Sequence, residues 1–98
     1  MPSTTRTQPI SSADRLRVAP HVRLTYDPAR RRHVLLSPEA VAVLNGTGVA
    51  VLRLCDGTRT VAEIVAGLRS RYDRVDDAEV RRFLDHLAAR RYVEAAHG

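Results

Sequence analysis

The chain lacks several residues on which particular classes of structure depend. Its 98 residues contain no lysine, no tryptophan and one cysteine, Cys55, which cannot form a disulfide within the chain. Nothing therefore indicates an oxidising compartment. Three tyrosines and one phenylalanine are the only aromatic residues, so aliphatic side chains must fill the core. Apolar runs are far shorter than the roughly 20 residues of a membrane span, and residues 1–15 hold no apolar block typical of a secretory signal. We expect a cytoplasmic protein without membrane partners.

The basic residues are all of one type. All 16 basic residues are arginine, against 11 acidic residues, and the net charge is +5. A guanidinium group binds carboxylates and phosphates through two parallel hydrogen bonds. The excess therefore indicates an acidic partner, whether a nucleic acid, a membrane surface or an acidic peptide. For any single arginine, a place on the solvated surface is the simpler interpretation.

The N-terminal half predicts an arm followed by a small sheet. Residues 1–15 are mostly polar and include two prolines, which is typical of a disordered arm. Apolar and polar residues alternate over residues 22–26, and residues 33–37 give a second strand pattern behind an Asp-Pro-Ala turn signal. Residues 40–44 are short and partly β-branched, so they predict a third strand, with a helix start as the alternative. The Asn-Gly pair that follows breaks either element, and Asn45 is the candidate N-cap of the next one.

Three helices are expected in the C-terminal half. The first covers residues 48–55 and ends at Asp56-Gly57, because glycine adopts the left-handed conformation at a helix end. The second begins at Thr60, which forms a capping box with Glu63. The third begins at Asp76-Asp77. Apolar residues at helical spacing predict the buried faces of the last two helices: Val61, Ile64, Val65, Leu68 and Tyr72 on the second, and Val80, Phe83, Leu84, Leu87 and Ala88 on the third.

The order of these elements predicts the fold class. Strands come first and helices follow, which is typical of an α+β domain whose three helices pack on one face of a three-stranded antiparallel sheet. A chain of this length forms one domain, which we place at residues 16–94. Residues 95–98 are expected to form a C-terminal tail.

The stretch around Cys55 decides whether the chain is expected to carry out chemistry. A phosphate-binding loop needs several converging glycines, whereas Asp56-Gly57-Thr58 has one glycine beside a carboxylate. A reactive thiol needs a base or a cationic neighbourhood that lowers its pKa, whereas Cys55 ends an apolar run next to Asp56 at a helix C-terminus, so we expect it to be buried and inert. The histidines share no metal-ligand spacing, and the acidic residues near Asp76 are interpreted as helix caps. The sequence therefore predicts no enzyme, no metal site and no cofactor.

Five segments, in this order and spacing, carry a resemblance to a known family. They extend from about Arg17 to Glu94 and resemble the pyrroloquinoline quinone (PQQ) biosynthesis protein D, or PqqD, family. The most specific of them is the Leu-Cys-Asp-Gly motif followed by Arg-Thr-Val. The segments are "HVRLTYD", "RHVLLSPE", "VLNGTG", "LRLCDGTRTVAEIV" and "FLDHLAARRYV".

The resemblance implies both a fold and a function. The fold is winged-helix-like, with a three-stranded antiparallel sheet packed on three helices, in agreement with the element order above. Family members are peptide chaperones, related to the recognition elements of ribosomally made, modified peptides. They bind the precursor peptide PqqA and present it to the radical S-adenosylmethionine (SAM) enzyme PqqE. The peptide adds as a strand to the sheet edge at the third strand, beside the third helix.

Alternation along the third strand gives this edge two faces. Ala42 and Leu44 are expected to point toward the helices, and Val41 and Val43 outward, where an apolar strand edge needs a cover such as an added peptide. In the alternative, Val41 and Val43 belong to the core and Ala42 faces outward. The candidate peptide-binding residues of the strand are Ala40, Val41, Ala42, Val43 and Leu44.

The third helix is expected to form the other wall of the groove. Its candidate residues project outward on neighbouring turns: Arg82, Asp85, His86 and Ala89. Ala89 would keep the groove open, while Arg82 and His86 would meet peptide carboxylates. Ordinary solvated helix surface accounts for each of these residues equally well.

Two other functions remain open at this stage. A recognition element of another modified-peptide pathway would have the same sequence features. A winged-helix DNA-binding protein is disfavoured, because Asp76, Asp77 and Glu79 stand at the helix end that would approach the bases and would repel phosphate. We therefore expect PqqA and PqqE as partners, no nucleic acid, and a monomer or weak homodimer.

Overall fold

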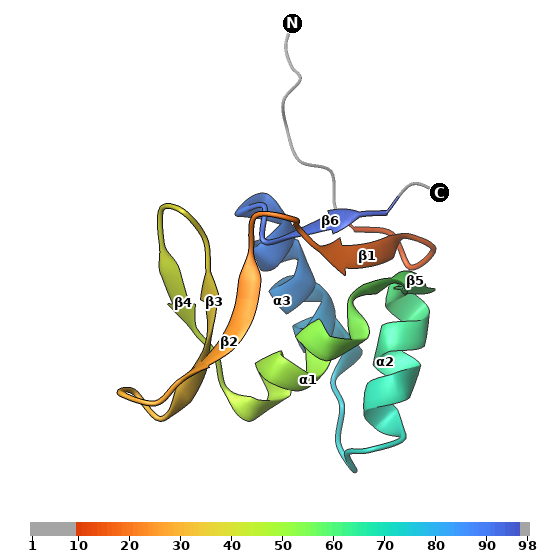
Figure 1. Ribbon diagram of the computed structural model, residues 1–98. Helices are drawn as coiled ribbons and strands as arrows, with labels where there is room; N and C mark the ends of the chain where they lie inside the picture. Colours follow the sequence, from red (N-terminus) through yellow and green to blue (C-terminus); the bar gives the residue numbers. More distant parts are fainter. Residues whose placement is uncertain (1–9, 97–98) are drawn as a thin grey trace, which may run out of the picture.

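The computed structural model describes residues 10–96, which form two three-stranded antiparallel sheets and three helices. In Figure 1 the sheet β2–β3–β4 projects to the left of the helices, and the sheet β5–β1–β6 lies above them. The predicted α+β class is confirmed. The elements in chain order are β1 (Arg15–Val18), β2 (Arg23–Asp27), β3 (Arg32–Leu36), β4 (Val41–Val43), α1 (Gly46–Leu54), β5 (Asp56–Thr60), α2 (Val61–Arg69), α3 (Asp77–Ala89) and β6 (Val93–Ala95).

The sheet β2–β3–β4 contains the three predicted strands in consecutive order. Leu24 lies opposite Leu35, and Leu35 lies opposite Ala42, so these three side chains share one face. That face packs on the helical core, in which Leu35 is fully buried. The β2–β3 turn places Arg31 at a positive φ of 54°. Local alternation and a short turn were sufficient to predict this sheet.

The second sheet was not predicted. Its strands β1, β5 and β6 come from the beginning, middle and end of the described chain and meet through long-range pairing. β1 begins at Arg15, so the expected arm over residues 1–15 is too long: residues 1–9 lie outside the described part, but residues 10–15 have a defined place. The Ile10 amide donates to the Asp85 carboxylate at 2.9 Å. Likewise Ala95, assigned to the C-terminal tail, belongs to β6.

The corner after Cys55 is also more regular than predicted. The residues that were expected to connect two helices form β5, which pairs with β1. Gly57 has a φ of +87°, as expected of the glycine, but it lies within β5, and α1 already ends at the cap residue Cys55. The Asp-Gly pair correctly predicted a left-handed backbone conformation at Gly57. A local pair of residues does not predict pairing with a strand that is distant in the sequence.

The helix starts follow their predicted caps. The Asn45 side chain accepts a hydrogen bond from the Gly48 amide at 2.7 Å, so α1 begins at Gly46 rather than at residue 48. Thr60 and Glu63 form the predicted reciprocal capping box of α2. Asp76 caps α3 by accepting the amides of its first turn. These side chains satisfy donors that have no partner inside the helix.

The core is aliphatic, as the scarcity of aromatic residues predicted. Among the described residues, Tyr92 is the one buried aromatic side chain, and Phe83 packs at the edge of the cluster. Most of the predicted helix faces are buried. Tyr72 is a correction, because it is 41% exposed. Since α2 ends at Arg69, the helical spacing that assigned Tyr72 to the buried face no longer applies there.

Candidate functional site

β4 forms one outer edge of its sheet and exposes apolar side chains. Val41 and Val43 are each 48% exposed, whereas Leu44 is 6% exposed and Ala42 packs against the core cluster. The predicted orientation of the strand is therefore confirmed, and the alternative with both valines in the core is excluded. Unlike an ordinary edge strand, β4 carries no charged side chain that would discourage pairing with another chain.

The main chain of β4 also faces outward at these two positions. The Leu44 amide donates to the His33 carbonyl at 2.9 Å, which makes Val43 and Val34 a non-hydrogen-bonded pair of the ladder. Val41 has the same relation to its partner at the other end of the strand. In an antiparallel strand, the N–H and C=O of one residue point to the same side. Those of Val41 and Val43 therefore point away from β3, toward the free edge.

The two faces of this edge differ in their surroundings. The face of Ala42 and Leu44 belongs to the helical core. The opposite face carries a strip of apolar side chains outside that core cluster. In this strip Val43 lies opposite buried Val34, and Val41 lies opposite partly buried Leu36. A strand beside β4 would therefore place alternate side chains against the outer strip and toward the helices.

The predicted residues on α3 do not form one uniform surface. Arg82, His86 and Ala89 are exposed, as expected. Asp85 is partly buried, and its carboxylate already accepts the Ile10 amide. Arg82 belongs to none of the ion pairs found among residues 10–96. Of this set, Arg82 is thus the unpaired charge best suited to a carboxylate.

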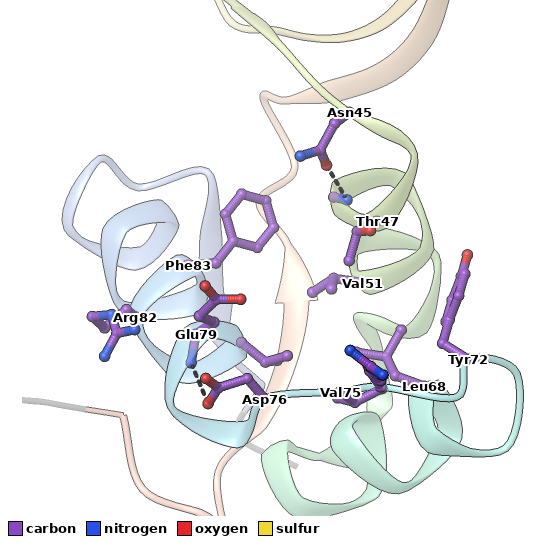
Figure 2. A pocket seen from close by; sticks show the side chains of 13 residues that line it. Asn45, Thr47, Val51, Leu68, Tyr72, Val75, Asp76, Glu79, Arg82 and Phe83 are labelled. Atoms are coloured by element: carbon purple, nitrogen blue, oxygen red, sulfur yellow. Dashed lines mark hydrogen bonds between the residues drawn. The ribbon is translucent and has the colours of Figure 1, made fainter.

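A cavity of about 470 Å³ lies between α1, the α2–α3 connection and α3. Figure 2 shows side chains from all three segments around it, with Asn45 and Phe83 at one end and Asp76 at the other. Arg82 is the only predicted site residue in its lining. Sequence patterns missed this cavity because α1, the end of α2 with the connection that follows it, and α3 build it together. The lining consists of Asn45, Thr47, Gly48, Val51, Leu68, Tyr72, Arg74, Val75, Asp76, Glu79, Val80, Arg82 and Phe83.

Cys55 is buried, as predicted, and lies outside this cavity. Its thiol donates a hydrogen bond to the Val51 carbonyl at 3.4 Å. Burial, with a smaller contribution from the negative charge of Asp56, raises the pKa of the thiol to about 12. A thiol in this state is a poor nucleophile at neutral pH.

Within residues 10–96, no group of three or more His, Cys, Asp or Glu side chains is arranged to hold a metal ion. No helix in that part of the chain is long and apolar enough to span a membrane.

These features define a small α+β domain with an open apolar strand edge and a neighbouring interhelical cavity. Residues 32–93 match the family described as coenzyme PQQ synthesis protein D (PqqD). The chain belongs to this family, and the resemblance found in the sequence is confirmed.

Individual relatives agree with this assignment. The PqqA binding protein of Azotobacter vinelandii is 40% identical over 74 residues, covering 74% of this chain and 80% of the relative. The bifunctional coenzyme PQQ synthesis protein C/D of Methylorubrum extorquens is 38% identical over 98 residues. That match covers 95% of this chain but 26% of the relative, so the chain spans about a quarter of the bifunctional protein.

Solved structures give the same fold. The solution structure of the PqqD truncation of Methylobacterium extorquens PqqCD superposes with a TM-score of 0.68 and 39% identity, covering 87% of this chain and 94% of that one. It represents a functional, stand-alone recognition element for ribosomally synthesised and post-translationally modified peptides. The heterocyclase TruD superposes with a TM-score of 0.59 at 22% identity over 82% of this chain and 11% of its own, a likeness of fold alone.

Proposed function

We propose that this chain is a peptide chaperone of PQQ biosynthesis, which binds the precursor peptide PqqA as a strand on the free edge of β4 and presents it to the radical SAM enzyme PqqE. The observation that carries the proposal is the double exposure of Val41 and Val43, in both side chain and main chain. Family membership and the names of the relatives support PqqA as the peptide. The proposed role is binding, without catalysis or a cofactor.

Main-chain pairing alone gives a modest affinity. The N–H and C=O groups of Val41 and Val43 offer four hydrogen bonds, which together contribute about 2–6 kcal/mol. A micromolar complex requires about 8 kcal/mol, and ordering a flexible peptide opposes binding. Side-chain contacts must therefore supply the remainder. The outer apolar strip beside the two valines is one source of such contacts.

The helix wall supplies contacts of another kind. Arg82 has no partner among the described ion pairs, and His86 and Ala89 are exposed on the same helix. Arg82 would bind a peptide carboxylate, and the net charge of +5 would favour the approach of an acidic peptide. Asp85 is expected to contribute least, because its carboxylate already accepts the Ile10 amide.

An amide NMR titration of the nitrogen-15-labelled chain with synthetic PqqA tests this function. Saturable shifts at Val41–Val43 and on the exposed face of α3 are expected. A DNA duplex serves as the control. Binding of the duplex to the chain, if it occurred, would weaken steeply as the salt concentration rises. Absence of shifts with PqqA would overturn the proposal. Shifts with DNA alone would assign a nucleic-acid function instead, and shifts with an unrelated leader peptide alone would assign the chain to another modified-peptide pathway.

A further inference from the structure

The cavity between α1 and α3 opens beside the end of β4. Its upper end is formed by Asn45 and Phe83, as Figure 2 shows. A methyl group built on Gly48 would lie 3.2 Å from both the Asn45 side chain and the Phe83 ring, and 3.6 Å from Leu44. Leu44 directly follows β4 in the chain. Asn45, which lines the cavity, is the second residue after Val43, so the cavity borders the end of the strand on which the peptide is proposed to pair.

The buried part of the cavity's lining is apolar, whereas the charged residues of the lining are exposed. Val51, Leu68 and Val80 are buried members of the core and form its floor. Tyr72 and Phe83 add aromatic surface from two sides, and Tyr72 is one of the few large apolar side chains that the described chain leaves exposed. A cavity of about 470 Å³ with such walls is of the size and character that buries one or two apolar groups.

The charges around the cavity balance one another. Arg74 and Arg82 oppose Asp76 and Glu79, and Asp76 already caps α3. A charged group would gain little in such surroundings and would lose its hydration, whereas an apolar side chain loses nothing. The lining thus favours an uncharged guest.

Resting on the proposed function, we propose that this cavity, the α1–α3 pocket, receives an apolar side chain of the peptide bound at β4. The side chain belongs to the part of the peptide that runs past Val43 toward Asn45. The strand edge alone does not fix the register of the peptide, because a peptide that slips by two residues along the three-residue strand β4 makes the same main-chain hydrogen bonds. One side chain held in the pocket fixes the register.

The test reduces the pocket without touching β4. Thr47 is exposed and lines the pocket, so Thr47→Trp would narrow it. Ala66 is exposed on α2 and outside the lining, so Ala66→Trp is the matched control. Fluorescence anisotropy with labelled PqqA should show binding about tenfold to a hundredfold weaker for Thr47→Trp, the range expected for one displaced apolar side chain. Circular dichroism melting checks that each variant folds, and Tyr72→Ala, which removes a wall, replaces Thr47→Trp if that variant is unfolded.

A double-mutant cycle identifies the guest. Each apolar residue of PqqA is changed to alanine in turn and measured against the wild-type chain and Thr47→Trp. One peptide position should lose affinity with the wild-type chain but lose little further with Thr47→Trp, because the two changes remove the same contact. Additive losses at every position would overturn the pocket proposal.

The outcomes separate this inference from the proposed function. If wild-type chain binds PqqA, Val43→Lys weakens binding and Thr47→Trp behaves like Ala66→Trp, the strand edge stands and the pocket has no part in binding. If the wild-type chain does not bind PqqA at all, the proposed function fails and the pocket proposal fails with it. A selective loss with Thr47→Trp and coupling at one peptide position supports both.

Discussion

Phe83 of α3 packs directly over Gly48 of α1, and a methyl group at position 48 would lie 3.2 Å from the Cζ atom of its ring. This distance is shorter than ordinary van der Waals contact between carbon atoms. The same methyl group would press on the Asn45 oxygen that caps α1. The absence of a side chain at position 48 therefore makes room for the Phe83 ring and the Asn45 cap. The φ of Gly48 is not positive, so its backbone conformation does not itself call for glycine.

We expect Gly48→Val to lower the free energy of unfolding by about 1–3 kcal/mol, the usual effect of overpacking. Urea denaturation followed by circular dichroism measures this value. Gly46→Ala is the control in the same helix, since a methyl group there meets nothing within 4 Å. Its expected effect is neutral or stabilising by up to about 1 kcal/mol, through helix propensity. Equal effects of the two substitutions would contradict the role assigned to Phe83.

Val43→Lys should weaken PqqA binding at least about tenfold, equivalent to roughly 1.4 kcal/mol, without unfolding the domain. The lysine would remove the apolar contact of Val43 with the peptide and place a charge on the edge strand, where lysine disfavours pairing with another chain. Because Val43 is already about half exposed, its loss costs the fold little. Isothermal titration calorimetry measures the affinity.

Val43→Thr is the control for this prediction. Threonine keeps the β-branched shape and adds no charge, so a smaller loss of affinity is expected than with lysine. An unchanged affinity for Val43→Lys would show that the peptide binds away from the edge of β4.

Thr60→Ala should destabilise the chain by about 0.5–2 kcal/mol, the usual cost of losing a helix cap. The Thr60 hydroxyl accepts the Glu63 amide at 3.1 Å, and the Glu63 carboxylate accepts the Thr60 amide at 2.8 Å. Thermal melting of the variant against wild type measures the loss. Thr60→Ser retains the hydroxyl and should recover most of the stability; a variant with serine as unstable as alanine would argue against the cap.

The capping box also gives a pH dependence. Hydrogen bonds, first from the Thr60 amide, hold the pKa of the Glu63 carboxyl below its usual value of 4.5. The folded state therefore binds fewer protons than the unfolded state just below that pH, and stability falls as the pH drops through the lowered value. Glu63→Gln should lose stability less steeply than wild type between about pH 5 and pH 3. Urea denaturation at several pH values measures the free energy of unfolding of both proteins. If it fell equally steeply for wild type and Glu63→Gln, the prediction would be refuted.

Cys55 should resist alkylation by iodoacetamide in the native chain at mildly alkaline pH, because burial raises the pKa of its thiol to about 12. The thiol should react readily once guanidinium chloride unfolds the chain. Mass spectrometry of the adduct follows both reactions. Rapid labelling of the native chain would mean that the turn after α1 opens easily.

Local patterns predicted a large part of this fold and one half of the candidate site. The hairpin strands, the capping residues and the exposure of Val41 and Val43 followed from alternation and helix-start signals within a few residues. Arg15–Val18 alternates charged and apolar residues, and this pattern is the local signal for β1. An alternation of only four residues beside a polar segment is too short to predict a strand without its partners.

What the sequence determined by itself is therefore the set of elements whose signals are local: caps, turns and the two faces of a strand. Tertiary structure decided the rest. The sheet β5–β1–β6 exists because main-chain groups from three distant segments satisfy one another. The engagement of Asp85 by Ile10 and the α1–α3 pocket depend on the same kind of long-range approach. No periodicity within a segment encodes which remote segment will face it, because that choice is made by the packing of the whole core.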